Sequence, residues 1–162
     1  MTACRTPRAA ARQLTTIAGG RRETVEGCAP VFRTFSKTVI HLGATGTGQL
    51  GKLFNDALML MNRKNIADIL AIAQAVKLDL PALLEVLRSG SASSAALLAL
   101  GSAVTASNAK HLQKLELIDV DLFARAVATQ RDKAAPVIEQ ALAGAETLPN
   151  LTTLITANTI PN

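Results

Sequence analysis

From Gln49 to about Val76, apolar residues recur at intervals of three and four. The repeating positions are Leu50, Leu53, Phe54, Ala57, Leu58, Met61, Ile69, Leu70, Ile72 and Ala73. This spacing predicts an α-helix. Leu60, Ile66 and Val76 fall outside the stripe, and a helix that is apolar on several sides is normally buried on several sides. We therefore expect one long helix at the centre of a helical domain.

Shorter helices are expected after it. Asp79 as N-cap, Pro81 in the first turn and Gly90 as the stop delimit one of them. The others are predicted from Ser94 to Leu100, ended by Gly101; from Asp119 or Asp121 to about Lys133; from Pro136 to Gly144; and near Leu151 to Ile155.

Two short β-branched stretches, Leu14 to Ala18 and Thr38 to Leu42, predict strands. The chain between them has helical spacing at Val25, Cys28 and Val31, although Pro30 weakens that prediction. The pattern as a whole predicts a mainly all-α fold. It consists of a multi-helix domain around one long central helix, preceded by a short two-strand segment.

Composition narrows the kind of core and the compartment. The 162 residues are 49% hydrophobic but include no Trp, no Tyr and only four Phe. The core must therefore be built from Ala, Leu, Ile and Val. Cys4 and Cys28 form no disulfide framework and are expected to be free thiols in a reducing cytoplasm. The longest uncharged run, residues 89–109, is rich in Ser, Thr and Gly, so no membrane span is expected.

The net charge of +5 comes entirely from residues 1–37, which carry seven Lys or Arg against two Glu. These basic residues are scattered, and no aromatic residues lie between them to stack on bases. We therefore expect no binding to nucleic acid. A solvated or partner-facing segment is the simpler interpretation.

The stretch "GATGTGQLGKL", Gly43 to Leu53, has the spacing of a phosphate-binding loop up to Lys52. A working loop has Ser or Thr after the lysine to hold Mg²⁺, and here the next residue is Leu53. The stretch instead predicts a sharp strand-to-helix turn with Lys52 in the first turns of the helix. His41 and His111 are isolated, so no metal site is expected.

The segments "LTTIAGG", "TVIHLGATGTGQLGKLFNDALMLMN" and "LDLPALLEVLRSGSASS" resemble the β-hydroxyacid dehydrogenases. That family includes 3-hydroxyisobutyrate dehydrogenase, tartronate semialdehyde reductase and, more distantly, 6-phosphogluconate dehydrogenase. Its motif G-x-x-G-x-G-Q-x-x-K-x-x-N-N joins a Rossmann domain to an all-helical C-terminal domain. The similarity runs from about Ala9 to the C-terminus.

The resemblance implies a role for four residues. Lys52 falls on the catalytic lysine, while Gly48, Asn55 and Asp56 fall on substrate-binding positions, with Asp56 in place of the second Asn. It also implies two domains. Residues 1–47 would be a remnant of a Rossmann-type NAD-binding domain, and residues 48–162 a helical domain for substrate binding and dimerisation, like that of 6-phosphogluconate dehydrogenase.

The departures from the family pattern are as informative as the match. Only the last two strands of the Rossmann domain, with the helix between them, have counterparts here. The family's Ser-Gly-Gly would fall near Ala3 to Arg5, its second lysine on Ile118, and its mid-helix Glu on Asp68. We therefore expect no cofactor-binding residues and no cofactor in the isolated chain. NAD or NADP would bind if a Rossmann partner completed the site.

Asp56 has two interpretations, and both remain open. In a residual site, its charge would repel a substrate carboxylate and, four residues after Lys52, would hold the lysine ammonium charged. Alternatively, Lys52 and Asp56 form an ordinary helix ion pair worth about 0.3 kcal/mol.

Three functions follow from these observations. The first is a truncated 3-hydroxyacid dehydrogenase-like protein, a cytoplasmic homodimer that is inactive alone and whose Lys52 is either a residual or a vestigial catalytic lysine. The second is half of an NAD(P)-dependent oxidoreductase, completed by a separate Rossmann chain that docks on the strands and the basic segment. The third is a regulatory module that binds a small anion or carboxylate near Lys52.

Overall fold

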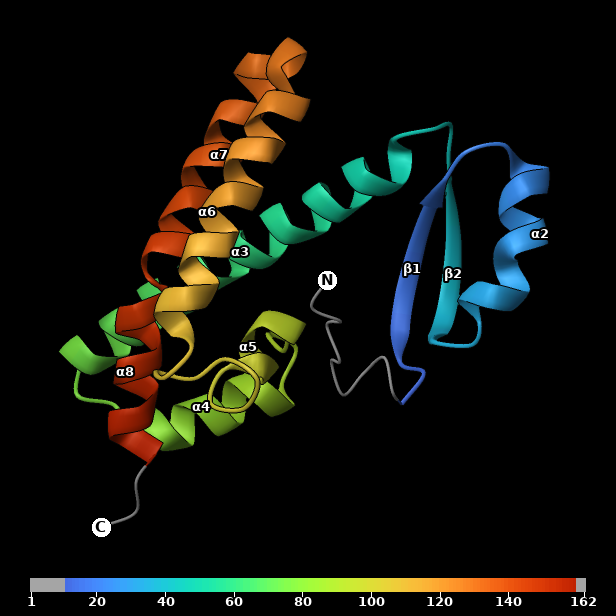
Figure 1. Cartoon of the computed structure of the whole chain (residues 1–162). Coiled ribbons are helices and arrows are strands. Elements are labelled where there is room, and N and C mark those ends of the chain that lie inside the picture. Colours follow the sequence, from blue (N-terminus) through green and yellow to red (C-terminus); the bar gives the residue numbers. More distant parts are fainter. Residues whose placement is uncertain (1–10, 160–162) are drawn as a thin grey trace. The chain divides into compact units, whose positions relative to one another are not determined.

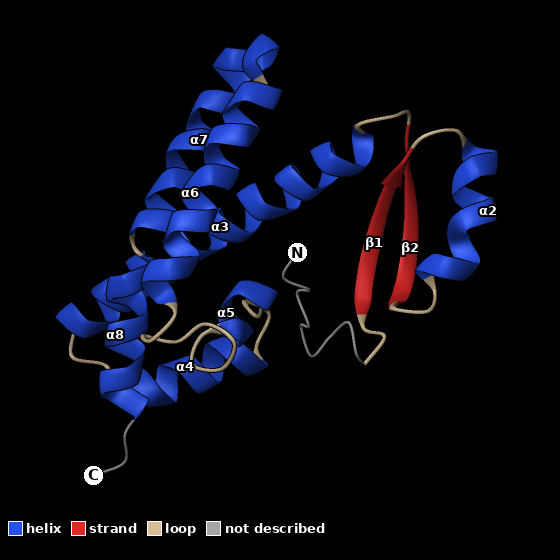
Figure 2. Cartoon of the chain, in the orientation of Figure 1, coloured by secondary structure: helices blue, strands red, loops and turns tan. Residues whose placement is uncertain are grey.

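The computed structural model describes residues 11–159, which form two compact units that meet in the chain at Phe54 and Asn55. The N-terminal unit contains β1 (Leu14–Gly19), α2 (Arg22–Phe32), β2 (Ser36–Gly43) and the first turns of α3 (Thr47–Ala75) (Figure 1). The helical unit contains the rest of α3 and the helices that follow it (Figure 2). The prediction of a mainly helical chain with two N-terminal strands is confirmed.

In the N-terminal unit, β1 and β2 pair in parallel, with Thr16 opposite Val39 and Ile17 opposite Ile40. Parallel neighbours need a crossover connection, and α2 supplies it and packs against both strands. Pro30 lies inside α2, close to its C-terminal end. The predicted strands and the helix between them are therefore confirmed.

The long central helix is also confirmed: α3 has 29 residues. Its burial is less complete than expected. Leu60 is buried and Ile66 packs against the core, whereas Ile69, Ile72 and Val76 are exposed. The other helices of the unit thus cover only part of the apolar surface of α3.

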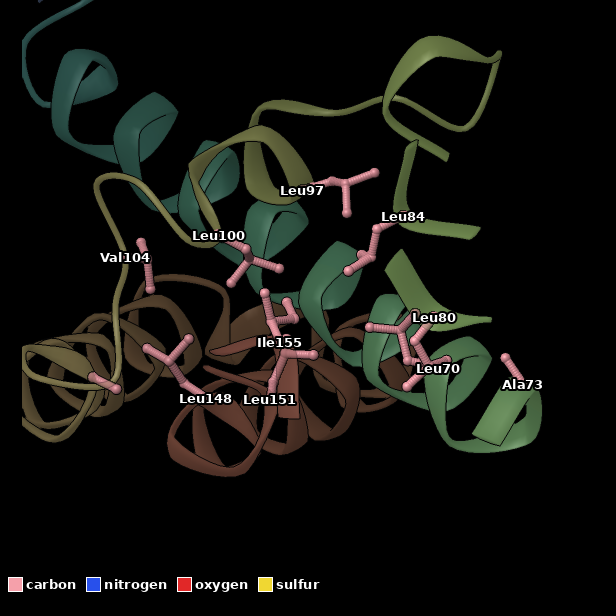
Figure 3. Packing of buried hydrophobic residues seen from close by; sticks show 11 residues of the cluster. Leu70, Ala73, Leu80, Leu84, Leu97, Leu100, Val104, Leu148, Leu151 and Ile155 are labelled. Atoms are coloured by element: carbon pink, nitrogen blue, oxygen red, sulfur yellow. The ribbon is translucent and has the colours of Figure 1, made fainter. Parts of the chain in front are cut away.

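The core of the helical unit is almost entirely aliphatic, as the composition predicts (Figure 3). It draws on α3, α4 (Leu80–Ser89), α5 (Ala95–Ala99), α6 (Ala109–Ala126), α8 (Leu148–Thr159) and the loop before α6. Its members are Leu70, Ala73, Leu80, Leu84, Leu97, Leu100, Val104, Ala109, Leu148, Leu151 and Ile155. Branched aliphatic side chains from distant segments thus hold the unit together by burying apolar area.

The ends of α4 and α5 follow from local signals. The Asp79 side chain accepts a hydrogen bond from the backbone N–H of Ala82 at 3.0 Å. Ser94 Oγ accepts one from the N–H of Leu97 at 3.2 Å. Gly90 is the C-cap of α4. These caps are confirmed because each depends on residues within one turn.

The predicted start of the next helix at Asp119 or Asp121 was wrong. Helix α6 begins at Ala109 and ends at Ala126. Its buried face includes Glu116 beside Ala109, Val120 and Phe123. A buried carboxylate interrupts the apolar repeat, and this hid the first half of the helix.

The predicted helix from Pro136 to Gly144 was wrong at both ends. A short 3-10 turn, η1 (Ala128–Gln130), leads into α7 (Arg131–Glu146), which contains both residues. Pro136 is exposed, so its ring points to solvent, and the carbonyl left without its helical partner belongs to exposed Asp132. The predicted helix near Leu151 is real but longer, as α8.

Candidate functional site

The turn that leads into α3 is built on glycines. Gly43 and Gly46 have φ angles of +130° and +91°, which side chains other than hydrogen rarely allow. A Cβ on Gly48 would lie 2.8 Å from the carbonyl oxygen of Ile17, so this glycine lets the start of α3 approach β1. Thr47 Oγ1 donates to the Ala44 carbonyl at 2.8 Å. The turn therefore fixes the direction in which α3 leaves the sheet.

The predicted site residues lie on α3 as the sequence motif requires. Lys52 is exposed in the second turn, and Asn55 and Asp56 follow within the next turn. Asn55 Nδ2 donates to Asp56 Oδ1 at 3.2 Å. Asn55 is exposed, whereas Asp56 is only 5% exposed. Of the predicted residues, the structure thus joins Asn55 to Asp56 directly.

Other positions singled out by the resemblance have ordinary surroundings. Asp68 accepts from Lys64 Nζ one turn earlier on α3, in a surface ion pair. Ile118, where the family's second lysine would fall, is exposed on α6. Ala3 to Arg5 lie outside the described residues.

A cluster of buried charges lies deeper in the helical unit. Arg63 on α3 is 3% exposed and Glu116 on α6 is 7% exposed. Arg63 Nη1 donates to Glu116 Oε1 in a direct ion pair. Arg63 Nη2 also contacts the Met59 sulfur at 3.9 Å. The repeat in the sequence did not reveal this cluster, because Arg63 lies in a polar stretch of α3, between Asn62 and Lys64.

The electrostatics of this cluster depend on Glu116. Its pKa is raised above the usual value, first of all by burial, while the hydrogen bond and the charge of Arg63 act in the opposite direction. The carboxylates of Asp119 and Asp56 raise it further. Arg63 Nε and Glu116 Oε2 are buried without a hydrogen-bond partner. Glu116 therefore occupies a desolvated place in which Arg63 and the nearby carboxylates act on its charge.

Other chemistry has little support within residues 11–159. No group of three or more His, Cys, Asp or Glu in that range is arranged to hold a metal ion. His41 Nε2 lies 2.8 Å from the Gly20 carbonyl oxygen, which is a structural contact within the N-terminal unit. Cys28 is an exposed free thiol.

No helix in the described part of the chain combines the length and the apolar character needed to cross a bilayer.

Comparison with known families identifies the origin of this arrangement. Residues 46–153, from the glycine turn through the first half of α8, match the model of the NAD-binding domain of NADP-dependent 3-hydroxyisobutyrate dehydrogenase. The chain belongs to this family. The resemblance read from Gly48, Lys52 and Asn55 is therefore confirmed at the level of the family.

Curated relatives agree with this assignment. The chain is 33% identical over 83 residues to the NAD-dependent L-serine dehydrogenase of Pseudomonas aeruginosa, covering 51% of this chain and 28% of that protein. It is 30% identical over 79 residues to a probable 3-hydroxyisobutyrate dehydrogenase of Mycobacterium tuberculosis, covering 49% and 27%. The matched region thus spans little more than a quarter of each relative.

A solved structure supports the fold. The 3-hydroxyisobutyrate dehydrogenase of Mycobacterium tuberculosis, determined with L-serine, superposes with a TM-score of 0.62 at 22% identity. The match covers 93% of this chain and 52% of that one. The chain therefore has the fold of about half of a complete dehydrogenase.

Proposed function

We propose that the chain provides the substrate-binding and dimer-forming part of a 3-hydroxyacid dehydrogenase, and that it is inactive alone. In this proposal, residues 1–47 correspond to the end of a dinucleotide-binding domain and residues 48–162 to the helical domain. The observation that carries the proposal is the junction of β2, the glycine turn and α3, which presents Lys52 early in a long helix. The family match begins within this junction, at residue 46. As a member of this oxidoreductase family, the chain would use NAD or NADP only in a complete enzyme.

Lys52 would act as general acid or base at the substrate hydroxyl, with Gly48 and Asn55 beside the substrate. Asp56 opposes this chemistry because a hydroxyacid brings its own carboxylate, and two like charges in a desolvated place repel. Its burial makes that charge costly to accommodate and ties it electrostatically to Glu116. The proposal therefore predicts a weakened site rather than an efficient one.

The variant Asp56→Asn tests the site. It restores the amide that the family motif has at this position and removes one negative charge. We expect 3-hydroxyisobutyrate to bind weakly to the wild-type chain and about tenfold more tightly to Asp56→Asn, a change that corresponds to removing one repulsive contact. Isothermal titration calorimetry measures both affinities.

Asp68→Asn is the matched control, because it removes an exposed carboxylate from the same helix. Its affinity should equal that of the wild type. Equal binding by all three proteins, or binding by none, would show that Lys52 is vestigial and only a part of helix α3.

A second candidate function, half of an enzyme completed by a separate Rossmann chain, is favoured by the N-terminal unit. Within the described residues, the sheet has two parallel strands, and parallel sheets are normally extended and covered on both faces. An apolar groove of about 510 Å³ is lined by Ile17, Ile40, Leu42, Thr47, Leu50, Gly51 and Phe54. Such a surface suits further strands and helices of a dinucleotide domain.

Cofactor titration separates these two functions. We expect no tight binding of NAD or NADP to the isolated chain, because the proposal assigns the pyrophosphate-binding turn to the partner. Adding a dinucleotide-binding fragment of the Pseudomonas aeruginosa relative should restore binding if the half-enzyme interpretation is correct. A micromolar dissociation constant of NAD or NADP for the chain alone would contradict both candidate functions.

A further inference from the structure

The helical unit has a pocket of about 230 Å³ that is lined by residues of α3, α4 and the segment that forms α5. Its polar lining residues are Asn62 and Asn65 from α3 and Ser94, the N-cap of α5. None of the residues predicted for the dehydrogenase site lines this pocket. It is therefore a separate cavity, formed within the helical unit alone.

The apolar wall of the pocket is held in place by the core. Leu97 is 1% exposed and belongs to the core cluster (Figure 3). Ile66 from α3 and Leu87 from α4 pack against the same cluster. A ligand would therefore meet a surface that the fold has already shaped, and few side chains would have to be ordered on binding.

Three polar side chains of the pocket have hydrogen-bonding capacity that the fold does not use. The Asn62 amide is half-buried and makes no hydrogen bond to any residue that the structure describes. Ser94 Oγ accepts from the Leu97 N–H at 3.2 Å, which leaves its O–H to donate. Asn65 Oδ1 accepts from Gln140 Nε2 at 2.7 Å, which leaves the NH₂ group of Asn65 to donate. A few polar groups that converge on an apolar pocket are the usual means of orienting a small ligand.

The charge of the pocket restricts the class of ligand. In the described part of the chain, no ionisable side chain lines it. A carboxylate or an ammonium ion that entered would lose hydration without gaining an opposite charge. The unused groups are N–H and O–H donors and the side-chain carbonyl of Asn62, which is an acceptor. This chemistry fits an uncharged molecule that carries both a carbonyl oxygen and an N–H group.

We propose that this pocket binds a small neutral amide with a short branched aliphatic group. The amide of the ligand pairs with that of Asn62, because each has a carbonyl acceptor and N–H donors. The aliphatic group packs on Ile66, Leu87 and Leu97. The pocket is smaller than the roughly 300–1,000 Å³ of a site for a drug-sized ligand, so only a small molecule fits. Binding here is independent of the chemistry proposed for Lys52.

Isovaleramide is a suitable probe, because it joins a primary amide to an isobutyl group. Titration of the isotope-labelled chain, followed by NMR, should give a dissociation constant of roughly 1 mM, since so small a ligand makes few contacts. The largest shifts should fall on the backbone amides of Ala92 and Ser94, which line the pocket, and on the side-chain amide of Asn62. Isovalerate has the same carbon skeleton with a carboxylate, and it should bind at least about tenfold more weakly.

Two variants test the assignment in different ways. Asn62→Ala removes the pairing amide and should weaken the binding of isovaleramide about fivefold. Ala92→Leu adds volume from an exposed loop position and should weaken binding about tenfold or more, because a filled pocket has no room for the probe. Asn150→Ala is the matched control, since Asn150 is exposed on α8 and does not line the pocket. Circular dichroism of each variant verifies that the helices are intact.

Each other outcome overturns a stated part of the proposal. No binding of isovaleramide at its solubility limit, or shifts confined to the apolar groove of the N-terminal unit, would refute the site. Isovalerate that binds as tightly as isovaleramide would refute the neutral class of ligand. Equal affinities of Asn62→Ala and Asn150→Ala would refute the role of Asn62. None of these results depends on whether the chain binds 3-hydroxyisobutyrate, so failure of the dehydrogenase function remains distinguishable.

Discussion

Gly144→Ala should destabilise the helical unit by about 3 kcal/mol, at the upper end of what overpacking of a core costs. A Cβ at this position would lie 1.9 Å from the carbonyl oxygen of Leu60 and 2.6 Å from its carbonyl carbon. These are backbone atoms in the middle of α3, so no side-chain rotation relieves the clash. Helix α7 would have to move away from α3 and loosen the packing of Ala141 and Ala145, which are fully buried beside it.

A glycine-to-alanine substitution at a second site should have the opposite effect on stability. Gly27 lies in α2, and a Cβ there would meet nothing within 4 Å. Gly27→Ala should therefore stabilise the N-terminal unit by about 0.5–1 kcal/mol through helix propensity. Urea unfolding followed by circular dichroism measures both variants. A Gly144→Ala protein as stable as the wild type would mean that α7 does not pack on α3 at this point.

The contrast between these glycines shows how far the sequence could predict the fold. Signals that act within one turn were sufficient: Asp79 and Ser94 cap their helices, and Gly90 ends one. In α7, Pro136 and Gly144 carry the same local signals for a start and a stop, yet both lie inside the helix. Solvent around Pro136 and the close approach of Leu60 to Gly144 override propensity there, and neither is visible in a local pattern.

For the candidate site, too, the sequence predicted one part of the arrangement and missed another. Spacing along one helix was enough to place Lys52, Asn55 and Asp56 within about one turn of one another. It could not predict that Asp56 is buried, because burial depends on the helices that pack on α3. Nor could it find the pairing of Arg63 with Glu116, which are 53 residues apart in the chain. Contacts between distant segments were the part that sequence reasoning lacked.

The pairing of Arg63 with Glu116 has a consequence for stability against pH. Glu116 is buried against Arg63, and its burial raises its pKa, to which the charge of the buried carboxylate Asp56 adds. Because the folded pKa lies above the unfolded value of about 4.5, the folded state retains a proton that the unfolded state has lost. This stabilisation is fully present below about pH 4.5 and is lost as the pH rises through the folded pKa.

Glu116→Gln should remove this dependence, because an amide keeps the shape of the protonated carboxyl but cannot ionise. The free energy of unfolding of wild type relative to Glu116→Gln should fall as the pH rises above about 4.5, by at most about 1.4 kcal/mol per pH unit. Taking the difference between the two proteins cancels the titrating groups that do not interact with Glu116. Glu139 is an exposed glutamate on α7. For the control variant Glu139→Gln, the difference in unfolding free energy from the wild type should not change with pH.

Asp56→Asn should narrow the pH range in which the wild type loses stability, since Asp56 is one of the charges that raise the pKa of Glu116. Urea unfolding between pH 4 and pH 9 would decide the sign. A difference that grows in favour of the wild type at high pH would mean that the ion pair with Arg63 outweighs burial and holds Glu116 ionised.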